Sequence, residues 1–133
     1  MKNLLTVFTA LLLSSNILIT QWEQSSAGIN GGQVFSLFVK DNIIFAGTYN
    51  YATRVANIYF TTNQGDSWKY SDMQNIEVNC FTAKDNIIFA GTENKGVYLS
   101  TNNGLNWART SQNNQSIYGM AVAGGYVLAG GGG

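Results

Sequence analysis

Apolar and polar residues alternate along this chain in short runs that recur at a regular spacing. A run rich in β-branched and aromatic residues spans Val34 to Val39, and a polar turn separates it from a second run, Ile43 to Phe45. Two such runs joined by a tight turn are typical of a β-hairpin. The pattern predicts the same hairpin twice more, at Val78 to Ala83 with Ile87 to Ala90 and at Ile117 to Val122 with Tyr126 to Ala129.

The repeat is also visible letter by letter. The octapeptide Asp41 to Thr48 is identical to Asp85 to Thr92, and a degraded third copy begins at Val127 and leads into residues 130–133, which we expect to form a loop. The two octapeptides lie 44 residues apart, whereas Trp68 and Trp107 lie 39 residues apart. The first copy therefore carries an insertion, and the fixed period indicates repeats that stack on one another.

Each of the two full copies holds two further strands. A third run covers Asn57 to Thr61 or Gly96 to Ser100, and a fourth begins at Trp68 or Trp107. Four short antiparallel strands in about 40 residues are typical of one blade of a β-propeller. The predicted fold is therefore all-β, a partial propeller of four-stranded antiparallel blades, about two and a half of them. The predicted boundaries are a stray outer strand at 21–26, blade 1 at 34–72, blade 2 at 78–110 and the start of blade 3 at 117–133.

An Asn-x-Gly sequence precedes each of the two later tryptophans. Asn can hydrogen-bond its own backbone two residues on, Gly supplies a positive φ without steric cost, and Trp buries a large ring against the sheet. These properties predict two structural turns. Their residues are Thr61, Asn63, Gly65, Ser67 and Trp68 in the first, and Ser100, Asn102, Gly104, Asn106 and Trp107 in the second.

The two turns resemble the Asp-box, or bacterial neuraminidase repeat, of the sialidase-like, sortilin-like and xyloglucanase-type β-propellers, and those of the propellers named for photosystem II assembly factors. Asn stands where that motif has Asp, and Asn106 replaces its Ser or Thr in the second copy. The resemblance covers Gln21 to Gly133. It implies a fragment of a bacterial secreted repeat protein, with these turns on the propeller face away from the ligand.

Neither turn has the composition of a calcium site. The first offers one carboxylate, Asp66, and the second offers none, whereas a Ca²⁺ ion takes several carboxylate oxygens. The chain has no His and one cysteine, Cys80, which removes serine-type catalytic triads and an internal disulfide. Cys80 takes the repeat position of Ser36 and Gly119, so we expect a buried small residue there. No metal or other cofactor is expected.

The net charge and residues 1–20 limit the expected binding partners and the expected cellular location of the protein. Seven basic and seven acidic residues cancel without forming a basic cluster, which disfavours nucleic acid. Residues 1–20 combine one Lys with an apolar run from Leu4 to Leu13, the pattern of a secretory signal peptide too short and interrupted to span a membrane. We therefore expect a secreted or cell-surface protein with no membrane span in the mature chain.

The insertion in the first copy supplies the candidate ligand site. On a propeller of the kind that the turns resemble, the loops between second and third strands lie on the ligand face. The insertion makes such a loop from Tyr49 to Ala56, and it carries Tyr49, Tyr51 and Arg54. Aromatic rings with polar neighbours suit stacking on a sugar or a peptide, so the expected partner is a carbohydrate or a protein. A surface loop without a specific ligand is the alternative.

The sequence supports a catalytic role less well than a binding role. Glycoside hydrolysis needs two converging carboxylates, and only Asp72, Glu77 and Glu93 could point toward a ligand. A sialidase would also need three arginines, but only Arg54 and Arg109 exist. We therefore expect a non-catalytic extracellular binding or scaffold module without catalytic residues in this chain. The alternative is a fragment of a propeller glycoside hydrolase, sialidase- or xyloglucanase-like, with its catalytic residues elsewhere, so whether the protein is an enzyme stays open.

Overall fold

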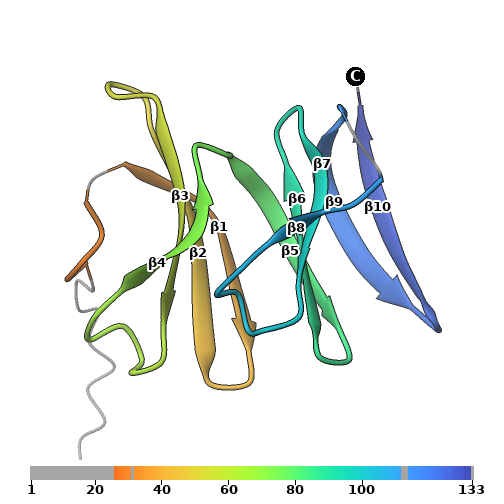
Figure 1. The fold of residues 1–133 in the computed structure, drawn as a ribbon, viewed down its shortest axis with the longest axis horizontal. Coiled ribbons are helices and arrows are strands. Elements are labelled where there is room, and N and C mark those ends of the chain that lie inside the picture. The colour runs from red at the N-terminus through yellow and green to blue at the C-terminus, as the bar shows by residue number, and fades with distance from the viewer. Residues whose placement is uncertain (1–25, 31, 112–113, 133) are drawn as a thin grey trace, which may run out of the picture.

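The computed structural model describes residues 26–30, 32–111 and 114–132, which form ten β-strands and contain no helix (Figure 1). The prediction of an all-β fold is confirmed. The strands are β1 (Gln33–Lys40), β2 (Ile43–Asn50), β3 (Val55–Thr61), β4 (Lys69–Gln74), β5 (Val78–Lys84), β6 (Ile87–Thr92), β7 (Gly96–Ser100), β8 (Ala108–Arg109), β9 (Ser116–Ala123) and β10 (Tyr126–Gly132).

The strands form three antiparallel sheets, each of which follows the order of the chain. Sheet A holds β1 to β4, sheet B holds β5 to β8, and sheet C holds β9 and β10. The three sheets stand side by side in chain order (Figure 1). None of them closes on itself within the described residues. The described residues also include no helix of a length and hydropathy that could cross a membrane.

The predicted signal peptide at 1–20 lies outside the described residues, and so does the predicted outer strand at 21–26 except for its last residue. Ser26 is not in a strand. The segment that follows lies against sheet A: Trp68 N donates to Ala27 O (2.8 Å), and Asn30 N donates to the hydroxyl of Tyr59 (3.3 Å). Residues 26–30 therefore cover part of the face of sheet A that points away from sheet B.

The insertion in the first copy of the repeat lengthens strands β2 and β3 more than it lengthens the loop between them. Strands β2 and β3 have eight and seven residues, against six and five in β6 and β7, and the connecting loops are residues 51–54 and 93–95. The prediction of a loop from Tyr49 to Ala56 was therefore wrong at both ends. Tyr49 pairs with Ala56 and Asn50 with Val55, because the added residues continue the antiparallel ladder.

The glycines at the end of the chain also differ from expectation. Gly130 to Gly132 belong to β10, whereas the sequence pattern predicts a loop there. They pair with β9 in the same way as the corresponding part of β6 pairs with β5, including an irregularity in the register. Backbone hydrogen bonds need no side chain, so the ladder continues through residues of low strand propensity.

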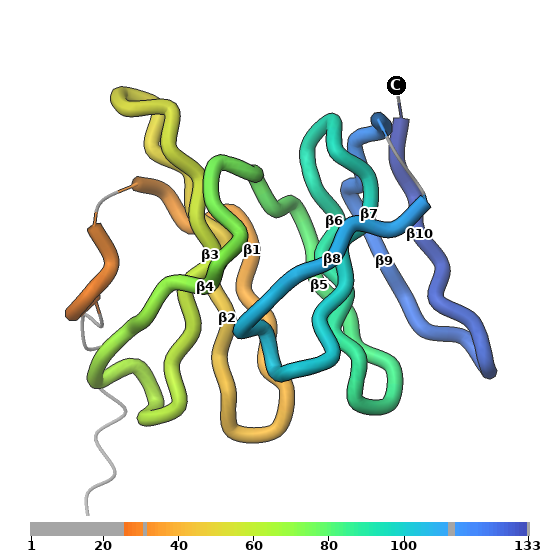
Figure 2. Tube along the Cα trace, viewed as in Figure 1, coloured from red at the N-terminus to blue at the C-terminus, as the bar shows by residue number. Residues whose placement is uncertain are grey.

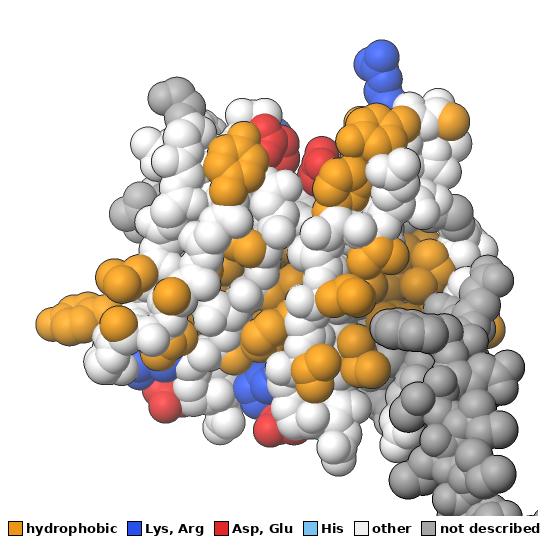
Figure 3. All heavy atoms as spheres, turned by 180° about the vertical axis from the view of Figure 1, so that it is seen from behind, with side chains coloured by type: hydrophobic (Ala, Val, Ile, Leu, Met, Phe, Trp, Pro, Cys, Tyr) orange, Lys and Arg blue, Asp and Glu red, His pale blue; other side chains and the backbone are white. Residues whose placement is uncertain are grey.

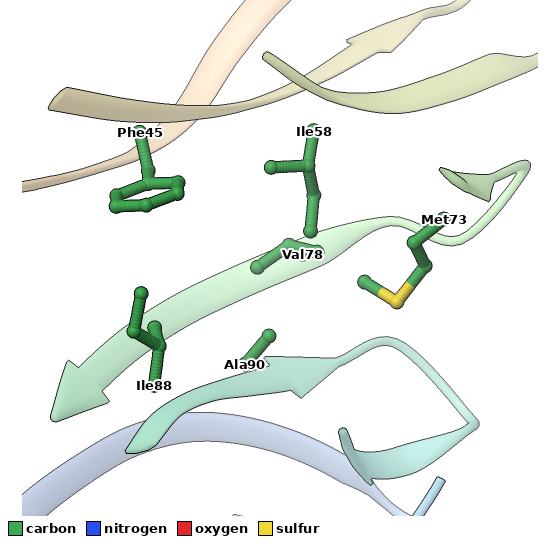
Figure 4. Close-up of a cluster of buried hydrophobic side chains, with 6 residues drawn as sticks. All are labelled: Phe45, Ile58, Met73, Val78, Ile88 and Ala90. Atoms are coloured by element: carbon green, nitrogen blue, oxygen red, sulfur yellow. The ribbon is translucent and has the colours of Figure 1, made fainter. Parts of the chain in front are cut away.

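The core lies between sheets A and B (Figure 4). Six buried side chains fill it: Phe45, Ile58 and Met73 from sheet A, and Val78, Ile88 and Ala90 from sheet B. Burial of an aliphatic or aromatic side chain stabilises a fold by about 1.5–3 kcal/mol. Phe38 of sheet A stacks on Phe81 of sheet B with 6.0 Å between ring centroids, which extends the core toward one end of the sheets.

One contact between sheets is repeated at both interfaces. Ser36 Oγ of sheet A donates to Val78 O of sheet B (2.8 Å), and Cys80 Sγ of sheet B approaches Ile117 O of sheet C (3.8 Å). Ser36 and Cys80 occupy the same repeat position, as the sequence predicts, and each lies opposite a glycine of the neighbouring strand, Gly47 or Gly91. Sheets A and B therefore present the same face to the sheet that follows.

Candidate functional site

The connections between strands fall at two ends of the sheets. The tight turns at residues 41–42, 85–86 and 124–125 lie at the same end as the two Asn-x-Gly turns, and we name it the turn end (Figures 1 and 2). Loops 51–54 and 93–95 and the linker at 75–77 lie at the other end, which we name the loop end. The candidate ligand residues and the structural turns are thus on opposite ends of the molecule.

Three aromatic rings meet at the loop end of sheet A, and we name them the aromatic cluster: Phe35, Tyr49 and Tyr51. The ring of Tyr49 is edge-on to that of Tyr51 at 4.9 Å, and Phe35 is edge-on to Tyr49 at 6.4 Å and to Tyr51 at 6.0 Å. Edge-to-face pairs at such distances are favourable. Tyr51 is 63% exposed and Phe35 is 40% exposed, so the cluster presents ring surface to solvent.

The side chain of Asn50 holds the loop beside the aromatic cluster. Its Oδ1 accepts hydrogen bonds from the backbone N atoms of Ala52 (3.0 Å) and Thr53 (3.1 Å). The Asn50 carbonyl accepts a third bond from the backbone N of Arg54 (2.6 Å), whose φ of 59° is left-handed. These bonds fix the backbone from which Tyr51 projects, as an Asx turn does. Arg54 is exposed at the end of the loop.

Phe35 was not among the predicted site residues. It lies in a β-bulge of β1, between Val34 and Ser36, where the register with β2 shifts. A bulge changes the direction of a side chain, and this one brings the Phe35 ring to Tyr49 and Tyr51. The bulge recurs in the repeat, since β5 has the same register shift between Val78 and Cys80. A pattern of apolar residues does not show where a bulge lies, so the sequence alone did not place the Phe35 ring.

A hollow of about 340 Å³ lies on the other side of the same loop. Its lining is uncharged and rich in amide, hydroxyl and phenol groups: Asn30, Thr48, Asn50, Thr53, Val55, Asn57, Tyr59, Tyr70 and Gln74. Thr48 and Tyr49 are neighbours on one strand and therefore point to opposite faces of sheet A. Loop 51–54 thus separates apolar ring surface on one face from polar groups on the other.

At the loop end of sheet B, the carboxylate of Glu93 accepts hydrogen bonds from two sheets. Asn79 Nδ2 of sheet B donates to Oε2 (2.9 Å), and from sheet C, Ser116 Oγ (2.8 Å) and Tyr118 OH (3.4 Å) donate to Oε1. The bond from Asn79, followed by those of the hydroxyls, lowers the pKa of Glu93. Glu93 is therefore a fixed anion that ties sheet C to sheet B.

The other two carboxylates singled out by the sequence lie in different places. Glu77 is beside Glu93, and burial, with a smaller effect from the Glu93 charge, raises the pKa of Glu77. Asp72 lies on β4 against the second Asn-x-Gly turn, where its Oδ2 accepts a hydrogen bond from Asn106 Nδ2 (2.9 Å). The structure thus brings Glu77 and Glu93 together and places Asp72 apart from them.

The two Asn-x-Gly turns are held by the same hydrogen bonds. In the first, Gly65 N donates to Thr61 Oγ1 (3.1 Å), Ser67 N donates to Asn63 Oδ1 (3.1 Å) and Asn63 Nδ2 donates to Ser67 Oγ (3.0 Å). The same three bonds join the four equivalent residues of the second turn, Ser100, Asn102, Gly104 and Asn106, at 2.9 Å each.

Each turn includes a glycine in the left-handed region. Gly65 has a φ of 96° and Gly104 a φ of 79°, as the sequence predicts for a positive-φ position. The indole of Trp107 donates to Gly104 O (3.1 Å), and its ring packs on Phe81 with 6.1 Å between centroids. Trp68 is half-buried, and its backbone N is bonded to Ala27 O. The side chains of Asn63 and Asn102 bond within their own turns, which supports a structural role for these residues.

Figure 3 shows the molecule from behind, with acidic side chains flanked by apolar side chains along the loop end. The turn end shows paired basic and acidic side chains in the same view. These pairs are Lys40 with Asp41 and Lys84 with Asp85, each 2.7 Å apart. Among the described residues, no three acidic or cysteine side chains gather closely enough to hold a metal ion.

Comparisons with known proteins show the fold and nothing of the function. No family model matches the chain, and no curated protein matches it. The solved structures that are similar to it include the computationally designed Ika4 protein (TM-score 0.64, 17% identity) and the computationally designed Ika8 protein (TM-score 0.58, 18% identity). The likeness covers 84% of this chain and 68% of Ika4, and 74% of this chain and 30% of Ika8. The chain thus spans less than a third of the length of Ika8.

Proposed function

We propose that this chain is part of an exported β-propeller of the Asp-box kind, and that it acts as a non-catalytic module that binds a carbohydrate at its loop end. Successive four-stranded antiparallel sheets, stacked through one repeated face, support the propeller. The two equivalent Asn-x-Gly turns support the resemblance to the Asp-box. The signal-peptide pattern of residues 1–20 supports export to the outside of the cell or its surface.

The observation that carries the binding proposal is the exposed aromatic cluster on a fixed loop. The C–H groups of a sugar ring stack on an aromatic face, and binding sites for such ligands combine apolar rings with a few convergent polar groups. Tyr51 offers the most exposed ring of the cluster, and Asn50 fixes the loop before any ligand arrives. A fixed loop has less conformational entropy to lose on binding.

The neighbouring hollow favours an uncharged ligand. Its lining has no Lys, Arg, Asp or Glu, whereas amides and hydroxyls of Asn57, Gln74 and Thr48 are present. Such groups can both donate hydrogen bonds to the hydroxyls of a neutral sugar and accept hydrogen bonds from them. At the same end, Glu93 already accepts bonds from four neighbours, Asn79, Asn94, Ser116 and Tyr118, which supports a structural role for that carboxylate and no role as a catalytic acid or base.

Binding of neutral β-linked glucan and xylan hexasaccharides to the full chain, measured by isothermal titration calorimetry, tests the proposal. We expect one of them to bind and Tyr51→Ala to weaken that binding about tenfold, which corresponds to about 1.4 kcal/mol. Tyr126→Ala is the matched control, because Tyr126 is 76% exposed but lies next to the tight turn of sheet C at the turn end. Equal affinities of wild type and Tyr51→Ala, or no binding of either sugar, would refute the proposal.

A further inference from the structure

The second Asn-x-Gly turn contains a chemically reactive pair of residues, Asn103 followed by Gly104. In an unfolded chain, the backbone N of such a glycine attacks the side-chain carbon Cγ of the asparagine. The new C–N bond closes a succinimide ring, and the side-chain nitrogen leaves as ammonia with the proton of the attacking N–H. Water then opens the ring and leaves aspartate or isoaspartate. Glycine favours the attack because it has no Cβ to shield its backbone N.

The folded turn holds Asn103 in a backbone geometry that prevents this attack. Asn103 has a φ of 57° and Gly104 a φ of 79°, and Leu105 N donates to Asn102 O (3.4 Å), as in a type I′ turn. A residue in the left-handed region has a ψ of about +47°. At that ψ the next backbone N lies nearly trans to Cβ about the Cα–C bond, whereas the succinimide ring needs it nearly cis. Gly104 N therefore points away from the carbon that it would attack.

Two further contacts keep the peptide between Asn103 and Gly104 from rotating. Gly104 N donates to Ser100 Oγ (2.9 Å), and Ser100 is 1% exposed, so water does not compete for this bond. Gly104 is itself buried against the Phe45 ring of sheet A. Rotation of the peptide breaks the bond to Ser100, so the reaction requires the turn to open. Asn103 is exposed, so water for the second step is present at once.

The first Asn-x-Gly turn has the same geometry without the reactive asparagine. Gln64 takes the place of Asn103 with a φ of 58°, and Gly65 N donates to Thr61 Oγ1 (3.1 Å). Glutamine has one more methylene group, so the same attack would have to close a six-membered ring, which forms much more slowly. The turn therefore tolerates glutamine at this position, and the reactive pair belongs to the second turn alone among these two.

We propose that Asn103 is a site of spontaneous deamidation, which the folded turn protects and which opening of the turn exposes. Loss of ammonia makes the step irreversible. Isoaspartate adds one carbon to the backbone between residues 103 and 104, so Gly104 no longer fits both Ser100 and the Phe45 ring. Because a packed interior does not absorb such a shift, the contact between the second turn and sheet A is lost. Asn103 thus converts a transient opening of the turn into a permanent loss of stability.

The rate of conversion of Asn103 in the full chain at mildly alkaline pH tests the proposal, with peptide mapping by mass spectrometry as the measurement. We expect conversion in the folded protein to be slower than in urea by about tenfold or more, because only the opened fraction reacts. Asn30 is also followed by a glycine and gives the reference rate in urea. Equal rates at Asn103 in the folded protein and in urea would overturn the proposal, as would an Asn103 that stays intact in urea while Asn30 converts.

Two variants of Ser100 test whether its hydrogen bond protects the site. Ser100→Ala removes the acceptor of Gly104 N and should raise the rate in the folded protein about fivefold, the effect of one hydrogen bond on the opening equilibrium. Ser100→Thr keeps a hydroxyl, as Thr61 does in the first turn, and should convert at the wild-type rate. If Ser100→Ala does not fold, it should convert at the rate seen in urea. A folded Ser100→Ala that converts no faster than wild type refutes the protection.

Asn103→Gln tests the consequence for stability. Gln64 shows that glutamine fits this turn, and Asn30 converts equally in wild type and variant, so the two chains differ only at residue 103. Both are incubated in urea, refolded and melted. We expect the incubated wild type to unfold at a lower temperature than before incubation, by more than the variant treated in the same way. Equal changes in the two chains would show that conversion of Asn103 leaves the second turn intact.

Discussion

The same glycine of the repeat stands in two different surroundings in this protein. Gly91 lies between sheets B and C, where a Cβ would come within 2.6 Å of Cys80 Sγ and 2.7 Å of Ile117 Cγ2. Gly130 takes the same position on the face of sheet C that points away from sheet B, where the nearest atom to a Cβ is Gly119 O at 3.9 Å. Both positions hold glycine, but only at Gly91 do the neighbouring side chains leave no room for a Cβ. The repeat therefore shows equivalent positions, and packing shows which of them carry a constraint.

The largest expected effect is at Gly104, in the second Asn-x-Gly turn. A Cβ at this residue would overlap the buried Phe45 ring, and its φ of 79° lies in the left-handed region, which strains an alanine. Strain of the backbone and overpacking together should lower the free energy of unfolding of Gly104→Ala by about 3 kcal/mol. Urea denaturation of wild type and variant measures this difference.

Gly124, in the turn of sheet C, is the matched control for the Gly104 variant. Its φ of 55° is also left-handed, but a Cβ there would meet nothing within 4 Å. Gly124→Ala should therefore cost only the backbone term, about 1 kcal/mol. If the two variants lose equal stability, the contact between the second turn and Phe45 does not constrain this glycine.

A smaller effect is expected at the glycine pair of the opening comparison. Gly91→Ala must displace Ile117 or Cys80 from the interface between sheets B and C, which should lower the free energy of unfolding by about 2 kcal/mol. Gly130→Ala should be neutral or should stabilise the fold by about 0.5 kcal/mol, because alanine restricts the unfolded chain. Thermal unfolding of the two variants side by side measures the contrast, and equal losses would show that sheet C does not pack as described.

Much of the fold could be predicted from the repeat, and the reasons are local. The strand positions follow from runs such as Val78 to Ala83, since a short run rich in β-branched and aromatic residues fits a pleated strand. The Asn-x-Gly turns follow from residues that make their own bonds, such as Asn63 to Ser67. Short-range patterns of this kind need no knowledge of the neighbouring sheet.

The errors arose where pairing between strands decides the outcome. Tyr49 was placed in a loop, but the ladder with β3 extends through it to Asn50. The bulge that turns Phe35 toward Tyr51 depends on the register of β1 with β2. The bonds of Glu93 come from Asn79, and from Ser116 and Tyr118 on another sheet. Contacts across strands and sheets have no fixed sequence spacing, so a local pattern does not predict them.

The smallest expected effect concerns the tie between sheets B and C at the loop end. Glu93 has a pKa below its ordinary value of 4.5, so the folded protein binds the proton of this group less readily than the unfolded chain does. Its contribution to stability is therefore complete above pH 4.5 and is lost as the pH falls through the lowered folded pKa. Glu93→Gln should remove this loss, so its unfolding free energy should change less with pH in that range.

Glu77 acts in the opposite direction and serves as the control for the pH dependence. Its pKa is raised above 4.5, so the folded protein takes up a proton first, and stability increases as the pH falls from the raised folded pKa toward 4.5. Glu77→Gln should remove that increase and leave the loss at lower pH. Glu93→Gln should remove the loss and keep a smaller increase, because burial, the larger cause of the raised Glu77 pKa, stays in place. Denaturation at a series of pH values separates the two. If both variants keep the wild-type profile, the bonds of Glu93 to Ser116 and Tyr118 do not contribute to holding sheet C against sheet B.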